Sequence, residues 1–194
     1  MGISRTTIAQ IDELLKSRNF VRRKANWNRK NEGYIDVVDL QISKSGDTFA
    51  VNSGVMDLEV YEICWGGKPT TFVEEPACTV RARIGELAVG SNSCWQLDDV
   101  NSVDNVCEKL VAHVLPFLER MHSPQAMEHF LEEAKVFKFQ YPPPIIYLAV
   151  LKYKQGKEDD AYALLDEIHK KSGEPWKAKI SEAAERMGNC PKTI

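Results

Sequence analysis

Two neighbouring segments, separated by a tight-turn sequence, most constrain what this chain can fold into. Residues 34–43 and 48–56 each divide into two sets of alternate positions, as the side chains of a β-strand do. Ser45-Gly46-Asp47 between them is typical of a hairpin turn. We therefore expect an antiparallel hairpin. The side chains of its first strand would divide between two faces as follows: Tyr34, Asp36, Val38, Leu40 and Ile42 on one face, and Ile35, Val37, Asp39 and Gln41 on the other.

Further periodic segments surround this hairpin and define the fold class. Residues 20–29 and 78–87 show strand-like alternation, and residues 6–17 carry apolar side chains at helical spacing. A long helix is predicted over residues 102–121, kinked by the proline within it. The sequence therefore predicts an α+β fold, with an antiparallel sheet of about four strands covered by helices and a C-terminal helical extension.

Prolines mark where this extension begins and where it turns. Ser123-Pro124 predicts a helix start, and the three consecutive prolines of Tyr141–Pro144 predict a rigid joint. Apolar spacing beyond the joint predicts three helices, over residues 145–155, 158–171 and 175–187. The expected organisation is an α+β sheet domain over residues 1–122 and a helical extension over residues 123–194, packed on that domain or forming a helical hairpin.

Composition excludes several classes of protein. Apolar residues make up 43% of the chain and charged residues 27%, which is ordinary for a folded, soluble protein. The net charge of -3 argues against a dedicated nucleic-acid coat protein, and no stretch approaches the roughly 18 consecutive apolar residues of a membrane span. Residues 1–10 lack the apolar segment of a signal peptide, so we expect a cytoplasmic protein without a membrane partner.

The residue types that carry catalysis or bind metals follow no recognised spacing. The five cysteines are odd in number and no pair has CxxC spacing, which predicts reduced thiols rather than a disulfide framework or a zinc site. Phosphate-loop, dinucleotide-binding and nucleophile-elbow motifs are absent from the sequence. We therefore expect no catalytic residue, no cofactor and no metal.

A basic stretch over residues 16–30 is the strongest asymmetry of charge, with seven basic side chains and no acid. Three interpretations are open for these basic side chains, taken together with Arg81 and Arg83 of the later strand. They are solvated residues at a sheet edge, a surface that binds an acidic protein partner, or a surface that binds nucleic acid. We favour a protein partner as the function, with nucleic acid as an open alternative. The candidate binding residues from this reasoning are Arg22, Arg23, Trp27, Arg81 and Arg83.

Polar residues inside the predicted strands suggest a groove on one face of the sheet. Gln41 and Asn52 need hydrogen-bond partners if they are buried, and Arg83 and Trp95 are candidates to lie near them. One interpretation is a polar network that fixes strand register, and the other is a binding groove. An enzyme with its site in this groove, near Gln41, Asn52, Arg83 and Cys94, is the competing class of function.

A series of short motifs carries a resemblance to a known family. The motifs are Phe-Val-Arg-Arg-Lys at residues 20–24, Trp-Asn-Arg at 27–29, Val-Val-Asp-Leu-Gln-Ile-Ser-Lys at 37–44, Phe-Ala-Val-Asn-Ser-Gly-Val at 49–55, Val-Arg-Ala-Arg-Ile-Gly at 80–85 and Cys-Trp-Gln-Leu at 94–97. Over about residues 6–122, the chain resembles the bacterial family called domain of unknown function 4304. The resemblance implies an α+β domain and a bacterial source, and no activity, because the family has none assigned. Analogy with other small bacterial families suggests an immunity or accessory protein of a toxin system.

Overall fold

The computed structural model describes residues 5–89, 94–96, 99–138 and 141–189, and these form an α+β fold. Its antiparallel sheet has six strands, which are β1 (Val21–Arg23), β2 (Asn26–Asn31), β3 (Tyr34–Ile42), β4 (Thr48–Asp57), β5 (Val80–Arg83) and β6 (Trp95–Gln96). The strand order is β1-β2-β3-β4-β5, and β6 pairs with the start of β4. The predicted fold class is confirmed. The single strand predicted over residues 20–29 is instead two paired strands, β1 and β2, because the chain turns at Lys24, and β6 is a further, very short strand.

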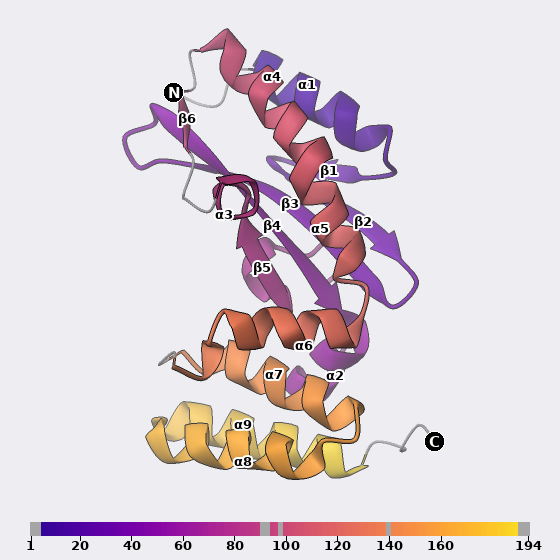
Figure 1. Ribbon diagram of the computed structural model, residues 1–194, viewed down its shortest axis with the longest axis vertical. Helices are drawn as coiled ribbons and strands as arrows, with labels where there is room; N and C mark the ends of the chain where they lie inside the picture. Colours follow the sequence, from indigo (N-terminus) through magenta and orange to yellow (C-terminus); the bar gives the residue numbers. More distant parts are fainter. Residues whose placement is uncertain (1–4, 90–93, 97–98, 139–140, 190–194) are drawn as a thin grey trace.

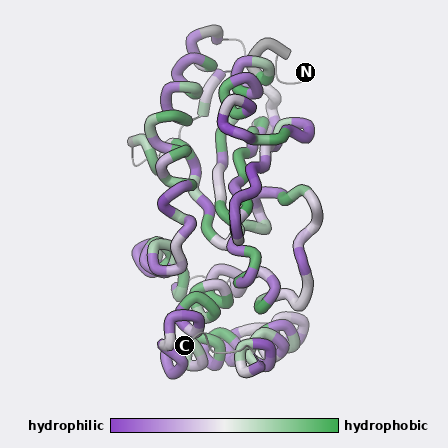
Figure 2. Tube along the Cα trace, turned by 90° about the vertical axis from the view of Figure 1, so that its right-hand side faces the viewer, coloured by the Kyte–Doolittle hydropathy of each residue, from purple (hydrophilic) through white to green (hydrophobic). Residues whose placement is uncertain are grey.

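The two faces of the sheet have the side chains that the alternation predicts. The inner face carries Val38, Val51 and Val55 into the main apolar core, against helices on that side. The outer face is partly covered by residues 66–79, which we call the covering loop and which includes the short 3-10 turn Glu75–Ala77. In the side view of Figure 2 the sheet lies between the inner-face helices and this loop.

The inner-face helices are α1 (Arg5–Lys16), α3 (Ile84–Val89), α4 (Val100–Lys109) and α5 (Leu115–Arg120). A π-helical segment, Leu110–Val114, joins α4 to α5, and the N–H of Leu115 donates to the carbonyl of Leu110, five residues back. Pro116 follows at once and has no N–H to continue the usual ladder. The kink predicted at this proline is therefore a local change in helical pitch within one nearly continuous rod (Figure 1).

The strand predicted over residues 78–87 is shorter than expected. Strand pairing begins at Val80 and ends at Arg83, and Ile84 already belongs to helix α3. The carboxylate of Glu86 accepts a hydrogen bond from the backbone N–H of Arg83, as an acid in the first turn of a helix often does. This local bond favours a helix start over further strand.

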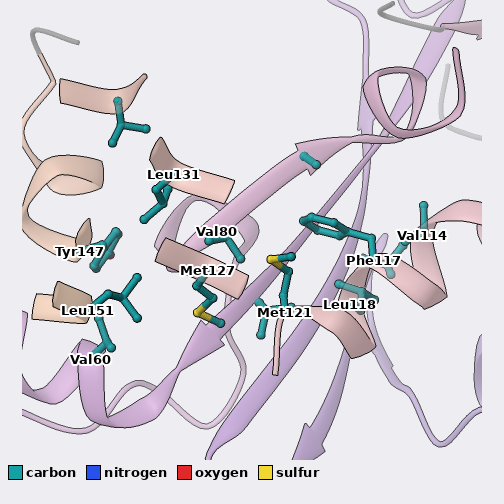
Figure 3. Close-up of a cluster of buried hydrophobic side chains, with 14 of the residues drawn as sticks. Val60, Val80, Val114, Phe117, Leu118, Met121, Met127, Leu131, Tyr147 and Leu151 are labelled. Atoms are coloured by element: carbon teal, nitrogen blue, oxygen red, sulfur yellow. The ribbon is translucent and has the colours of Figure 1, made fainter. Parts of the chain in front are cut away.

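The C-terminal helices form a layer at one end of the sheet (Figure 1). They are α6 (Pro124–Glu133), the 3-10 turn Val136–Lys138, α7 (Pro143–Lys154), α8 (Glu158–Lys171) and α9 (Glu174–Asn189). Helix α7 is at the centre of this layer, with an almost continuous run of buried residues from Ile145 to Lys152. Figure 3 shows apolar side chains that connect the layer to the sheet: Val60, Val80, Phe117, Met121, Met127, Leu131, Tyr147 and Leu151.

Helix α2 (Leu58–Trp65) attaches this layer to the sheet, because it follows β4 directly and packs on α7 and α9. The guanidinium of Arg186 in α9 donates to the carbonyl of Ile63 at 2.7 Å and to that of Cys64 at 2.9 Å. These carbonyls belong to the last turn of α2, where the helix itself offers no donor. Gly66 caps α2 through the carbonyl of Glu62, and Arg186 adds donors from a distant part of the chain for the next two carbonyls.

Candidate functional site

A row of polar side chains crosses the outer face at right angles to the strands. Each residue in this row faces the next one on the neighbouring strand, by the observed registers, and the row consists of Arg23, Asn26, Asp39, Asn52 and Arg83. Neighbouring strands lie about 4.8 Å apart, so the row, which we call the polar row, is about 19 Å long. It has an arginine at each end and a carboxylate in the middle.

The covering loop determines where the outer face stays open. Its Val73 is held by Asn28, whose side chain donates to the Val73 carbonyl at 2.9 Å and accepts from the Val73 N–H at 2.6 Å. Beneath the loop lies a small apolar cluster that contains Val37, Met56 and Cys78. The polar row is the next row of side chains after this covered part, so the loop forms one wall beside it.

Neutral amides hold the arginine at one end of the polar row. Arg83 Nε donates to Asn52 Oδ1 at 3.2 Å and Arg83 Nη2 donates to Gln41 Oε1 at 3.3 Å. Asn52 Nδ2 donates to the same oxygen of Gln41 at 3.2 Å, which closes a three-residue network. The amides orient the guanidinium without neutralising it, and a carboxylate has room to approach its remaining N–H groups.

Arg81, two residues away on β5, has a different partner. Its Nε and Nη2 donate to the two carboxylate oxygens of Glu75 at 2.6 and 2.8 Å. This hydrogen-bonded pair holds the pKa of Arg81 above its usual range, so the charge of the arginine is matched within the protein. Among the described residues, Arg23 and Arg83 form no ion pair with a carboxylate.

The polar row forms the floor of a hollow of about 710 Å³, which we call the polar hollow. Its walls are the covering loop, from Phe72 to Pro76, and the β1–β2 turn at Lys24 and Ala25. Gln41 and Arg81 also line it. Five of the candidate binding residues therefore line this hollow: Arg23, Gln41, Asn52, Arg81 and Arg83. Arg23 was expected on the basic surface rather than in the predicted polar groove, and the structure places it beside the groove residues.

Asp39, at the centre of the polar row, has an altered acidity. Burial raises the pKa of this carboxyl, and the negative charge of Glu75 raises it further, while a hydrogen bond from Asn52 acts in the opposite direction. A raised pKa widens the pH range in which this carboxyl is neutral, and the neutral form both donates and accepts hydrogen bonds. Asp39 and Asn26 are not among the candidates predicted from the sequence, although both lie on the sheet face that carries Gln41.

The raised pKa makes a prediction for stability as a function of pH. Between the ordinary pKa of an aspartate and the raised one, the folded state binds more protons than the unfolded state, so Asp39 lowers stability as the pH rises through this interval. Asp39→Asn should therefore raise the free energy of unfolding at about pH 7 and change it less at about pH 3, as measured by urea denaturation.

Asp47 provides a control of opposite sign. Hydrogen bonds from Ser45 and Ser43 lower the pKa of the Asp47 carboxyl, so Asp47→Asn should reduce the free energy of unfolding at neutral pH. A lower stability for Asp39→Asn at neutral pH would contradict the assigned environment of Asp39.

The two tryptophans selected from the sequence lie away from the polar row. Trp27 is fully buried on the inner face, and its Nε1–H donates to Asp12 Oδ1 of α1 at 2.9 Å. Trp95 is 8% exposed, lies 5.9 Å from the ring of Phe49, and donates to Asn105 at 3.0 Å. Both indoles have their partners inside the protein.

The expected surface that combined Arg22 and Trp27 with the β5 arginines is not assembled. Arg22 lies opposite Trp27 on the neighbouring strand, and its guanidinium is 3.7 Å from Asp12 on the inner side. Arg23 is the next residue and therefore points to the outer face, toward the polar hollow. The basic stretch is thus divided, and its Arg29 binds the buried Asp36 at 2.7 Å.

Residues suited to other chemistry are dispersed in the described part of the chain. Cys94 is exposed, but it precedes β6 and does not line the polar hollow. Within the described ranges, no three His, Cys, Asp or Glu side chains are grouped to hold a metal ion. None of the described helices is both long and apolar enough to cross a membrane.

A comparison with family models matches residues 11–120 to domain of unknown function 4304. The match includes the whole polar row, and it ends before the C-terminal helices begin. No curated protein and no solved structure matches the chain.

Proposed function

The chain belongs to the family of domain of unknown function 4304, and we propose that it is a non-enzymatic binding module whose polar row receives an extended, acidic segment of another protein. The proposal includes a bacterial source and a role as an immunity or accessory protein, which rest on the family resemblance and on analogy, and a cytoplasmic setting, which rests on the cysteine pattern and on residues 1–10.

This proposal rests on the two arginines at the ends of the polar row, whose guanidinium groups have no carboxylate partner among the described residues. Arg83 is half-buried and held by two amides, and Arg23 is exposed, and neither forms an ion pair among the described residues. An arginine oriented by neutral groups in a hollow is arranged to bind a carboxylate with charge-assisted hydrogen bonds. Arg81 is the internal comparison, since its carboxylate is already supplied by Glu75.

The shape of the site supports an extended peptide as the ligand. A fully extended chain advances about 3.3 Å per residue, so about six residues would span the polar row. Backbone N–H and C=O groups of such a segment would find hydrogen-bond partners in Asn26 and Asp39 along the floor.

Charge favours an acidic peptide over nucleic acid. The carboxylates of Asp39, Glu74 and Glu75 lie in the same hollow as the arginines, and they would repel a continuous phosphate backbone. A peptide with separated acidic residues can place these opposite the arginines and neutral groups opposite the acids.

Arg83→Glu tests this proposal directly. Random dodecapeptides displayed on phage and selected on the wild-type protein should be enriched in Asp and Glu. Arg83→Glu should weaken binding of a selected peptide by about tenfold or more, measured by fluorescence anisotropy, because the carboxylate would meet a like charge. Arg18→Glu makes the same charge change at an exposed residue outside the hollow and should leave affinity nearly unchanged. Equal affinities for the wild type and Arg83→Glu, or a selection without acidic enrichment, would refute the proposal.

The raised pKa of Asp39 favours a second candidate, an enzyme with this carboxyl as its general acid or base. Mass spectrometry of selected peptides incubated with the protein distinguishes the two functions. Unaltered peptides support the binding module, whereas a change in mass that Asp39→Asn abolishes supports the enzyme.

A further inference from the structure

A second hollow, of about 620 Å³, adjoins the polar hollow at the outer edge of β5. Both hollows are lined by Asn52, Glu75, Pro76, Arg81 and Arg83, so they share a boundary at the arginines of β5. The second hollow lies between β5 and the helices α6 and α7, and we call it the apolar hollow.

The apolar hollow has a wall of a different chemical character from that of the polar row. Its helical side is formed by Phe130, Leu131, Ala134, Val136, Pro143 and Tyr147. Tyr147 is held in place by two hydrogen bonds, since it accepts from Trp65 Nε1 at 3.1 Å and donates to the carbonyl of Ala77 at 3.4 Å. Tyr141, which is 55% exposed, also lines the hollow.

We propose that the apolar hollow takes a large apolar side chain, aromatic or aliphatic, from the same acidic segment that binds the polar row. This inference rests on the proposed function, and it specifies the partner as a peptide in which an acidic residue lies one to three positions from a large apolar residue. An extended chain advances about 3.3 Å per residue, so this spacing places the two side chains about 3 to 10 Å apart along the segment.

The shared boundary of the two hollows and the charge of Arg83 both indicate an apolar side chain from the acidic segment as the occupant. Arg83 lines both hollows and its guanidinium has no carboxylate partner among the described residues, so the acidic residue of the ligand has its place at their boundary. Arg81 lies at the same boundary, but Glu75 already neutralises it. Beyond the boundary, an apolar side chain meets the apolar walls formed by α6 and α7, while Glu86 on the β5 side of the hollow accepts the backbone N–H of Arg83.

The apolar wall belongs to residues beyond the family match, which ends at residue 120. The polar row lies within the match, and Phe130, Leu131, Ala134, Val136, Pro143 and Tyr147 lie outside it. The family domain would therefore supply the binding of the acidic residue, while the C-terminal helices would supply selectivity for its apolar neighbour.

Ala134→Trp is designed to fill the apolar hollow. Ala134 is exposed, lines the hollow and follows the last turn of α6, so the larger side chain can occupy the hollow without entering the core. Ala163→Trp is the matched control, because Ala163 is exposed on α8 and does not line the hollow. Circular dichroism and thermal unfolding of both variants establish that they fold.

The experiment selects phage-displayed random dodecapeptides on the wild type, Ala134→Trp, Ala163→Trp and Arg83→Glu. The wild type and Ala163→Trp should enrich an acidic residue near a large apolar one, while Ala134→Trp should retain the acidic enrichment and lose the apolar one. Replacing the apolar residue of a selected peptide by Ala should weaken its binding to the wild type by about tenfold to a hundredfold.

The outcomes separate this inference from the proposed function. Apolar enrichment that persists in Ala134→Trp, or is absent in the wild type, would overturn the inference while the polar row keeps its role. Acidic enrichment that persists in Arg83→Glu, or no enrichment on any protein, would overturn both.

Discussion

Asp36→Asn is expected to lower the free energy of unfolding by about 3–5 kcal/mol, because it removes the charge that balances a largely buried arginine. Asp36 is completely buried in β3. Its Oδ2 accepts from Arg29 at 2.7 Å and from Asn31 at 3.0 Å, and its Oδ1 lies 2.6 Å from His122 Nε2. The carboxylate thus joins β2, β3 and the segment that follows α5.

Arg29 makes the loss large because its other contacts cannot replace Asp36. Its guanidinium lies 4.8 Å from the centre of the Phe20 ring, and Glu119 is 3.9 Å away and mostly exposed. Its Nη2 is buried and has no hydrogen-bond partner in the part of the chain that the structure describes. After the substitution, the buried cation would keep the Phe20 ring and a neutral amide at position 36, and its remaining carboxylate contact among the described residues would be the mostly exposed Glu119.

Urea denaturation monitored by circular dichroism measures this effect. Asp104→Asn makes the same chemical change on the exposed surface of α4 and should stay within about 0.5 kcal/mol of the wild type. A loss below about 1 kcal/mol for Asp36→Asn would mean that the Arg29–Asp36 pair contributes little net stability, as in proteins where desolvation cancels the attraction.

Trp27→Ala is expected to cost about 3–5 kcal/mol of stability, because it leaves a cavity in the main core. Trp27 is fully buried among apolar residues of α1 and the inner face, including Ile11 and Leu15. The substitution also leaves Asp12, which accepts the indole N–H, with one hydrogen bond fewer. Because the sequence alone makes Trp27 a candidate for a binding surface, the result discriminates between a surface role and a core role for this residue.

Two further variants make the test of Trp27 specific. Trp27→Phe keeps most of the buried ring and should cost less than Trp27→Ala, since it loses chiefly the hydrogen bond to Asp12. Trp176→Ala removes a half-buried indole that contacts Trp65 and Tyr141, and it should also cost less, because solvent already reaches that ring. Thermal unfolding orders the three variants, and a neutral Trp27→Ala would be incompatible with a core position.

Elements with strong periodicity were predictable from the sequence, and their pairing across long separations was not. The β3–β4 hairpin was predictable because its turn sequence and its alternating side chains both indicate paired strands. Helix α8 was predictable from the helical spacing of its apolar residues. The pairing of Asn52 with Arg83 could not be predicted from the sequence. Residues 58–79 lie between the two strands and contain both α2 and the covering loop, so no turn sequence sets the register of β4 and β5. Grouping these two residues as a polar groove relied on their strand faces alone.

The basic stretch shows a different limit. Its charges are local in sequence, but Lys24 adopts a positive φ of 60° in the turn between β1 and β2, and the chain reverses there. Arg22 and Arg23 then point to opposite faces, and a tryptophan beside them belongs to the core. The density of basic residues along the sequence therefore predicted too large a basic surface, because successive side chains of a strand point to opposite faces of the sheet.

The pair of hydrogen bonds that Arg186 provides has a consequence for the order in which the protein folds. Its two acceptors, Ile63 and Cys64, are made early on the ribosome, and 123 residues separate Ile63 from Arg186. Until α9 has been synthesised, the last turn of α2 must bond to water, and the apolar surfaces that meet α9 stay uncovered. Helix α2 therefore reaches its final hydrogen bonding only after α9 has been synthesised. Closing a contact of such long sequence separation costs more chain entropy than forming the β3–β4 hairpin.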